Sequence, residues 1–209
     1  LYGPLQPGQI HPFTCPGVAH CRGHQIAALH TLSFGIPEEA EPGDLVINEI
    51  LFNPGTGGSD FLELYNKSQK LIDLSVLRVL ELDPEDPSVI LEFGSLSEEK
   101  RLLLPGQFFV ITEDLIDIGS RYTIGLDAVY VESSDMPNFP DDEGIVRIET
   151  NGFTMIDQLH FFDDWHYGLL DDEDGVSLER LRYDLPTEDP ENWHSAAEDA
   201  GFATPGRIN

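Results

Sequence analysis

The chain of 209 residues carries 39 acidic and 11 basic residues, which gives a formal net charge of −28 at pH 7. A surface this negative repels phosphate backbones, which proteins bind through Lys and Arg, so the composition argues against nucleic-acid binding. The hydrophobic fraction of 40% argues against disorder, and the 19 Gly and 15 Pro residues scattered between short apolar runs favour an all-β fold.

Residues 1–35 differ in texture from the rest of the chain, because they hold four histidines, both cysteines and little acid. Cys15 and Cys21 flank a short turn-like insert, and this spacing favours a disulfide in an exported protein. The alternative is a zinc site made by the two cysteines with His20 and His24, although the cysteine spacing does not match the C-x₂₋₄-C pattern of structural zinc sites.

Residues 36–43 read IPEEAEPG and connect this first segment to the next one. Pro37 and Pro42 restrict the residues before them to extended backbone. The sequence therefore predicts a short, stiff linker and a domain boundary here.

Two strands separated by a Gly-rich run are predicted next, over 44–52 and 61–66. The first is apolar on both faces apart from Asn48 and Glu49, whereas the second alternates along its length. We therefore expect the first strand to be central in a sheet and the second strand to be half exposed.

Glu49 and Glu63 face each other across this strand pair in one of the two alternative registers. The favoured role in that register is structural: the carboxylates accept hydrogen bonds from loop amides or pair with an arginine such as Arg180. Two alternatives remain, namely metal ligation and general acid-base hydrolysis, which uses paired carboxylates.

The rest of the chain consists of short apolar runs separated by turn residues, with no convincing 3.6-residue periodicity. Pro105-Gly106 and Asn151-Gly152 are turn signals, and each predicts a hairpin between the strands that flank it. A single helical turn or a loop is expected at 113–118. Further strands are predicted over 76–82, 89–93, 101–104, 107–112, 127–131, 145–150, 153–162 and 175–183. Many short strands at turn-marked intervals predict a β-sandwich.

Several stretches occur in an order that is typical of one known domain: NEI at 48–50, FLELYN at 61–66, IDLS at 72–75 and TPG at 204–206. With them, residues 44–209 resemble the lamin-tail domain, a domain of nuclear lamins and of secreted and surface proteins of bacteria. The resemblance implies an immunoglobulin-like β-sandwich but says little about function, because one fold hosts many functions. The family-signature residues, for which the resemblance implies structural roles, are Asn48, Glu49, Glu63, Asn66, Asp73, Arg180 and Trp193.

Within the first segment, PGQIHPF and GVAHCRGHQIA resemble the last strand-turn-strand unit of a bacterial immunoglobulin-like domain. This second resemblance implies that residues 1–35 are the C-terminal strands of a preceding module. Residues 36–43 would then be the linker to the lamin-tail-like sandwich of residues 44–209.

The densest acidic cluster lies between residues 163 and 174. Hard cations bind several carboxylate and carbonyl oxygens, so this cluster predicts a Ca²⁺ site, although its spacing does not fit an EF-hand loop. The alternatives are a solvated acidic coat and Asp-rich turns whose carboxylates accept from backbone amides. A transition-metal site of His160 and His166 beside Asp163 is a further alternative. The predicted calcium ligands are Asp163, Asp164, Asp171, Asp172 and Asp174.

No apolar run is long enough to predict a membrane-spanning helix, and neither a G-x-S-x-G motif nor a phosphate-binding loop with its lysine occurs. We therefore expect a non-catalytic module of a secreted or cell-surface bacterial protein, acting as a spacer, adhesion or assembly domain of a larger multi-domain chain. Expected partners are proteins or glycans at the cell surface and neighbouring domains of the same polypeptide. The alternatives are a Ca²⁺-stabilised ligand-binding accessory domain of a larger hydrolase, and a hydrolase in its own right.

Overall fold

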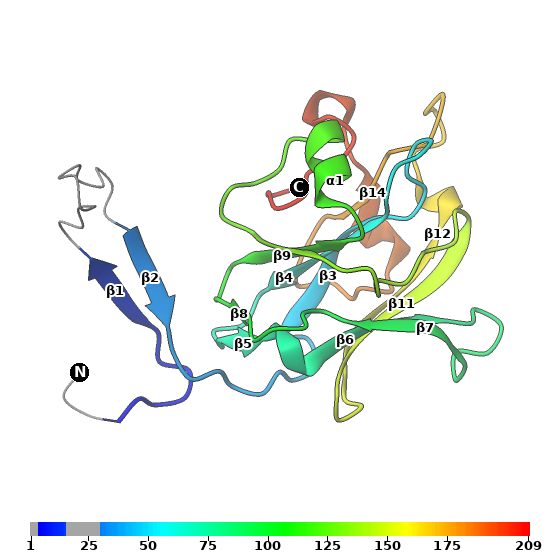
Figure 1. The fold of residues 1–209 in the computed structure, drawn as a ribbon. Coiled ribbons are helices and arrows are strands. Elements are labelled where there is room, and N and C mark those ends of the chain that lie inside the picture. Colours follow the sequence, from blue (N-terminus) through cyan, green and yellow to red (C-terminus); the bar gives the residue numbers. More distant parts are fainter. Residues whose placement is uncertain (1–3, 16–29) are drawn as a thin grey trace.

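The computed structural model describes residues 4–15 and 30–209, and this part of the chain contains two β-sheets packed face to face (Figure 1). The larger sheet has six strands in the order β10 (Val129–Glu132), β9 (Phe108–Thr112), β4 (Phe61–Asn66), β3 (Leu45–Leu51), β13 (Leu178–Arg180) and β14 (Trp193–Ser195). The smaller sheet has four strands in the order β12 (Met155–Phe162), β11 (Glu143–Thr150), β6 (Leu77–Leu82) and β7 (Ile90–Ser95). The expected all-β sandwich is confirmed.

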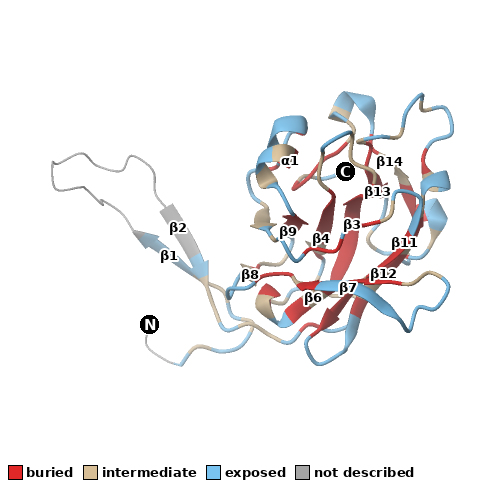
Figure 2. Ribbon diagram, turned by 45° about the vertical axis from the view of Figure 1, so that its right-hand side comes forward, coloured by how far each residue is buried: buried red, intermediate tan, exposed pale blue. Residues whose placement is uncertain are grey.

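The main hydrophobic core lies between the two sheets and takes side chains from both. Phe52 at the end of β3 stacks on Phe161 of β12, with ring centroids 4.5 Å apart. Figure 2 shows that β3, β4 and β13 in the middle of the larger sheet are buried, whereas β7 is largely exposed. The burial of apolar area between the sheets is the main force that holds them together.

The expectation that the second strand, β4, is half exposed is wrong, because five of its six residues are buried and Tyr65 is intermediate. The outer face of the larger sheet, which points away from the main core, is also covered. The cover is formed by α1 (Leu115–Arg121) and by residues 202–206, which pack on that face through a separate apolar cluster. The cluster contains Leu51, Phe61, Val110, Ile118, Tyr122 and Ala203.

Helix α1 begins where Asp114 accepts hydrogen bonds from the amides of Ile116 and Asp117, as an N-cap residue does. It buries Ile118 against the sheet. Among the described residues, the helices are too short or too polar to cross a membrane.

The predicted hairpin around Pro105-Gly106 is wrong in its pairing but right in its turn. Gly106 has φ +75° and the Gln107 amide donates to the Leu104 carbonyl. The flanking strands nevertheless separate: β8 (Leu102–Leu103) pairs with β5 (Ile72–Asp73), whereas β9 pairs with β4 and, in parallel, with β10. Longer-range partners therefore replace the local pairing.

The predicted hairpin around Asn151-Gly152 is confirmed, since β11 and β12 pair antiparallel on either side of it. The positive φ of this turn falls on Phe153, at +68°, rather than on the glycine. The Phe153 amide donates to the Thr150 carbonyl, and the ladder shifts between Ile148 and Glu149. The turn is therefore a longer, bulged one instead of the two-residue turn that Asn-Gly favours.

A two-stranded sheet of β1 (His11–Cys15) and β2 (His30–Phe34) projects away from the sandwich (Figure 1). The linker predicted over 36–43 lies against the sandwich: the Glu38 amide donates to the Leu71 carbonyl, Ala40 is buried in the main core, and the Gly43 amide donates to the Ile156 carbonyl.

Candidate functional site

Three glutamates lie side by side across the middle of the larger sheet. Glu63 of β4 is opposite Glu49 of β3, and Glu49 is opposite Glu179 of β13. A shift in the ladder at Asn48, between Ile47 and Glu49, sets this register. Glu49 and Glu63 have no exposed surface and Glu179 is 2% exposed, so the three form a buried carboxylate row.

The carboxylate row holds the segment Thr204-Pro205-Gly206 against the sheet. Glu49 accepts from the Ser177 hydroxyl at 2.6 Å and from the Thr204 amide at 2.8 Å. Glu63 accepts from the Gly206 amide and from Asn48 Nδ2, and Glu179 accepts from the Thr204 hydroxyl at 2.6 Å. The row therefore links β3, β4 and β13 to residues 204–206 through hydrogen bonds.

The burial of the row changes its protonation. Burial, with repulsion from Glu179 as the second cause, raises the pKa of Glu49 to about 8. Burial and the neighbouring Glu49 raise the pKa of Glu63 well above its ordinary value. Like charges this close do not all ionise together, and with a pKa of about 8 Glu49 holds a proton at neutral pH. Because residues 204–206 cover it, this geometry supports a structural role for Glu49 and Glu63 and gives a substrate no access.

Arg180 points to the other side of the sheet from its neighbour Glu179, as successive residues in a strand do. Its side chain is fully buried and is not a partner of the carboxylate row. Nε donates to the Ile47 carbonyl at 2.6 Å, Nη1 donates to the Leu185 carbonyl at 3.2 Å, and Nη2 donates to the Thr187 hydroxyl.

Trp193 lies beside this arginine, with the guanidinium carbon 5.2 Å from the ring centroid. The indole Nε1 donates to the Thr187 carbonyl at 2.8 Å. Asp157 of β12 approaches Arg180 at 3.7 Å and accepts from the Ile47 amide at 2.8 Å. Arg180 therefore joins the two sheets to the 181–187 loop.

Asn66 and Asp73 support local backbone. Asn66 Nδ2 donates to the Lys70 and Leu103 carbonyls, at 3.0 and 3.3 Å. Asp73 accepts from the amide and hydroxyl of Ser75, which starts a 3-10 turn at Leu74–Val76. All seven family-signature residues thus bond or pack within the sandwich.

Asp163 and Asp164 begin a short 3-10 helix, Asp163–Trp165, whereas Asp171, Asp172 and Asp174 lie on the loop that follows, and all five are exposed. Asp172 accepts from the Asp174 amide at 3.2 Å, and Asp174 accepts from Asn53 Nδ2 at 3.2 Å. Over residues 4–15 and 30–209, no three or more His, Cys, Asp or Glu side chains are grouped so that they could hold a metal ion.

The two histidines of this region lie in separate environments. His160 pairs with Glu143 at 2.8 Å. His166 is buried against Phe52, with Nδ1 2.9 Å from the Ser195 hydroxyl, and burial lowers its pKa to about 4. His166 is therefore a neutral core residue at physiological pH.

The calcium prediction has a direct test. If the cluster binds Ca²⁺, millimolar Ca²⁺ added after chelation raises the thermal midpoint by several degrees, because a ligand of the native state alone stabilises it. The rise is then lost when Asp171, Asp172 and Asp174 are changed to Asn. The matched control changes Asp83 and Asp86 to Asn, which lie in another turn of the chain. A midpoint that ignores Ca²⁺ would contradict the prediction.

The predicted disulfide between Cys15 and Cys21, and its zinc alternative with His20 and His24, fall on residues or side chains outside the described part of the chain. Both stay predictions.

A feature that the sequence analysis did not single out is the edge strand β7. It lies at the end of the smaller sheet and carries Ile90, Leu91 and Phe93, which are 45, 50 and 60% exposed, and Val89 directly before it is 42% exposed. Four large apolar residues this exposed on one strand edge are unusual for a surface, and such patches commonly mark interaction sites. The run Val-Ile-Leu-x-Phe was visible in the sequence, but an apolar run alone does not distinguish a central strand from an edge.

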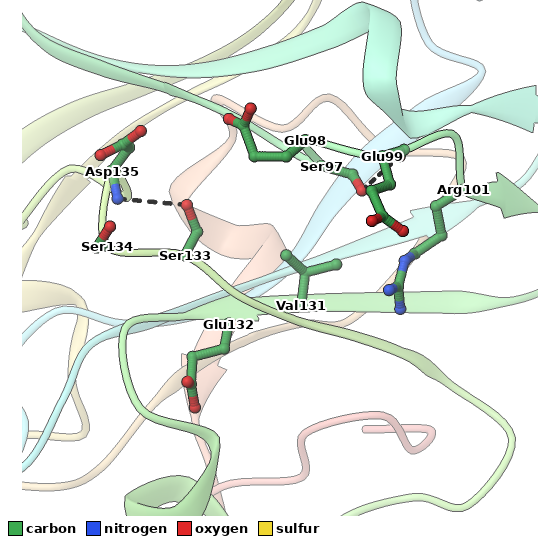
Figure 3. Close-up of a pocket in the computed structure, with 9 residues that line it drawn as sticks. All are labelled: Ser97, Glu98, Glu99, Arg101, Val131, Glu132, Ser133, Ser134 and Asp135. Carbon is green, nitrogen blue, oxygen red and sulfur yellow. Dashed lines mark hydrogen bonds between the residues drawn. The ribbon is translucent and has the colours of Figure 1, made fainter.

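Acidic hollows lie beside this edge. Figure 3 shows the first, of about 240 Å³, between the loop after β7 and the end of β10. Ser97 donates to the Glu99 carbonyl at 2.7 Å, the Asp135 amide donates to Ser133 at 3.3 Å, and Arg101 donates to the Tyr130 carbonyl at 3.0 Å. No histidine or cysteine lines it.

The second hollow runs along β7 itself and shares Ser134 and Asp135 with the first, so the two form one acidic trough. The carboxylates that line the trough are Glu92, Glu98, Glu99, Glu113, Glu132 and Asp135. The pKa of the nearby buried Asp60 is raised to about 7, first by burial and then by repulsion from Asp141 and Glu113. This side of the molecule therefore presents a negative field next to an apolar strand edge.

Comparisons with protein-family models, with curated proteins and with solved structures found no match for this chain. The class that the fold defines is an all-β sandwich, and the lamin-tail resemblance stays a prediction from the sequence.

Proposed function

We propose that the chain is a non-catalytic interaction module of a secreted or cell-surface bacterial protein, built as a lamin-tail-like sandwich and serving as an adhesion, assembly or spacer domain of a larger chain. The observation that carries the proposal is the exposed apolar edge strand β7 at one end of the smaller sheet. An edge strand is where a β-sheet can pair with another chain.

Two further features support the proposal. Glu49 and Glu63 were the candidate catalytic acids in the sequence. Their carboxylates accept hydrogen bonds from the backbone amides of Thr204 and Gly206. The linker segment at 36–43 packs on the sandwich through Ala40 and Glu38, which fixes where the preceding hairpin leaves the body. A module with a fixed exit direction suits a chain of linked domains.

The test separates a binding module from a hydrolase. The purified chain is incubated with a panel of chromogenic glycosides, esters, phosphodiesters and peptides, beside a Glu49→Gln/Glu63→Gln control. We expect no turnover above that of the control, together with saturable binding to members of an array of cell-surface proteins and glycans. Turnover that disappears in the double variant, or no saturable binding to any member of the array, would overturn the proposal.

A further inference from the structure

The register of β6 with β7 decides which side chains of the edge share a face. Phe93 is opposite Leu80, and Ile90 is opposite Leu82. Leu80 and Leu82 form a small buried cluster with Ile145 on the outer face of the smaller sheet. Opposite residues in a ladder lie on the same face, so Ile90 and Phe93 extend this cluster to the edge, where they are 45 and 60% exposed. The Arg78 guanidinium carbon lies 5.5 Å from the centroid of the Phe93 ring and covers part of it.

The other face of the same edge is acidic. Glu92 is opposite Glu81, and it lines the acidic trough with Glu113 and Asp135. Burial raises the pKa of Glu81, and repulsion from Glu92 adds to it. A ligand of this edge would therefore need apolar side chains on the outer face of the smaller sheet and positive charge on its other face.

The backbone of the edge is open over the same residues. In the described part of the chain β7 is the last strand of its sheet. The loop after β10 reaches this strand at Gly94, where a Cβ atom would meet the Asp135 carbonyl at 1.9 Å, and at Glu92, whose carboxylate accepts from the Asn138 amide at 3.3 Å. Residues Ile90 to Phe93 are left without a strand neighbour on that side.

We infer that β7 accepts an extended peptide segment of alternating apolar and basic residues, which adds to the smaller sheet as a fifth strand. β7 has one extra residue, Leu91, between Ile90 and Glu92, because Leu82 is opposite Ile90 whereas Glu81 is opposite Glu92. Side chains of a strand alternate between faces, so an added strand that passes this bulge as β6 does places every second residue against Ile90 and Phe93, and the residue between them reaches Glu92 and the trough. The charge argues for this occupant over a second copy of the chain, because two copies would bring two Glu92 edges together in a molecule of net charge −28. The inference rests on the proposed function and names its partner.

The test uses three synthetic peptides of about ten residues, long enough for a full strand. One alternates Val and Lys, one has the same composition with the valines and lysines in separate blocks, and one alternates Val and Glu. Affinity is measured by fluorescence anisotropy in low and high salt, and amide hydrogen exchange of the chain is followed with and without peptide.

We expect the alternating Val-Lys peptide to bind at least about tenfold more tightly than the block peptide, and the Val-Glu peptide not to bind. Bound peptide should slow exchange at the amides of Ile90 to Phe93, and salt should weaken it through screening. Ile90→Lys/Phe93→Lys should reduce the affinity at least about tenfold, since it places charge on the apolar face. Ile116→Lys/Leu126→Lys, at two other exposed apolar positions, is the matched control and should bind as the parent does.

Equal binding of the alternating and block peptides, or unchanged exchange in β7, would overturn the inference and leave a non-specific acidic surface. Dimerisation of the chain that is lost in Ile90→Lys/Phe93→Lys would overturn it in favour of a second copy. The inference and the proposed function can fail independently. Peptide binding at β7 without binding to any member of the cell-surface array would contradict the proposed function alone. Array binding that persists in Ile90→Lys/Phe93→Lys would contradict the inference alone.

Discussion

The free energy of unfolding is expected to fall as the pH rises from about 6.5 to about 8, because Glu49 holds a proton in the folded chain that it releases on unfolding. Its pKa is about 8 when folded and 4.5 as the ordinary value. A raised folded pKa gives stability that is complete below the ordinary pKa and is lost as the pH rises through the folded one. Over 1.5 pH units the loss is on the order of 2 kcal/mol, or roughly 4 to 8 °C in the thermal midpoint.

Two other titrating groups explain why the pH window from about 6.5 to about 8 is chosen. Asp60, with a folded pKa of about 7, acts in the same direction. His166 acts in the opposite one, since a pKa lowered to about 4 gives stability that is present above its ordinary value of 6.5 and lost as the pH falls. Above pH 6.5 the histidine contributes little further change, so the carboxylates decide the slope.

Glu49→Gln and Glu49→Ala separate the proton from the hydrogen bonds. The glutamine keeps an acceptor for Ser177 and Thr204 without a titrating group, so thermal melts should show a smaller pH slope and a higher midpoint at pH 8 than the parent. The alanine leaves both donors unpaired in a cavity and should lower the free energy of unfolding at every pH, by about 3 kcal/mol or more. A parent slope that persists unchanged in Glu49→Gln would show that the proton resides elsewhere.

Replacing Arg180 by Leu is expected to lower the stability by roughly 3 to 5 kcal/mol, which corresponds to a midpoint lower by about 10 °C. The change removes the partner of the Ile47 and Leu185 carbonyls and of Thr187, and it leaves Asp157 without its nearest positive charge. Arg180→Lys should recover only part of the loss, because a lysine cannot reproduce the fork of guanidinium donors.

The matched control is Arg182→Leu, two residues along the same chain. Arg182 is 61% exposed in its side chain and pairs with the similarly exposed Asp184, so its loss should leave the stability nearly unchanged. Urea and thermal unfolding of the three variants measure the difference. Equal destabilisation by Arg180→Leu and Arg182→Leu would contradict the assignment of Arg180 as a buried link.

Local patterns were sufficient to predict the elements that depend on neighbouring residues. The β11 and β12 pair follows from Asn151-Gly152 and two flanking apolar runs, and the strand character of β3 and β4 follows from their composition. The facing pair Glu49 and Glu63 was one of two alternative registers, and the shift at Asn48 selects it.

The features that sequence reasoning missed depend on residues far along the chain. The burial of β4 needs α1 and Ala203 on its outer face, and β9 leaves its local partner because β4 and β10 take both of its sides. The exposure of β7 follows from its place at the end of a sheet, which its own residues do not encode. Short strands read alike at the edge and in the middle, so their neighbours decide.

The carboxylate row also sets when the fold can be completed. Glu49 and Thr204, which it joins, are 155 residues apart, and Glu63 and Gly206 are 143 apart. Contacts between residues so distant form slowly, since a long loop must close before they contribute. Until residues 204–206 have been synthesised, three glutamates in the centre of the sheet lack the partners that this segment supplies. The sandwich is therefore completed late in synthesis, when residues 204–206 have joined the sheet.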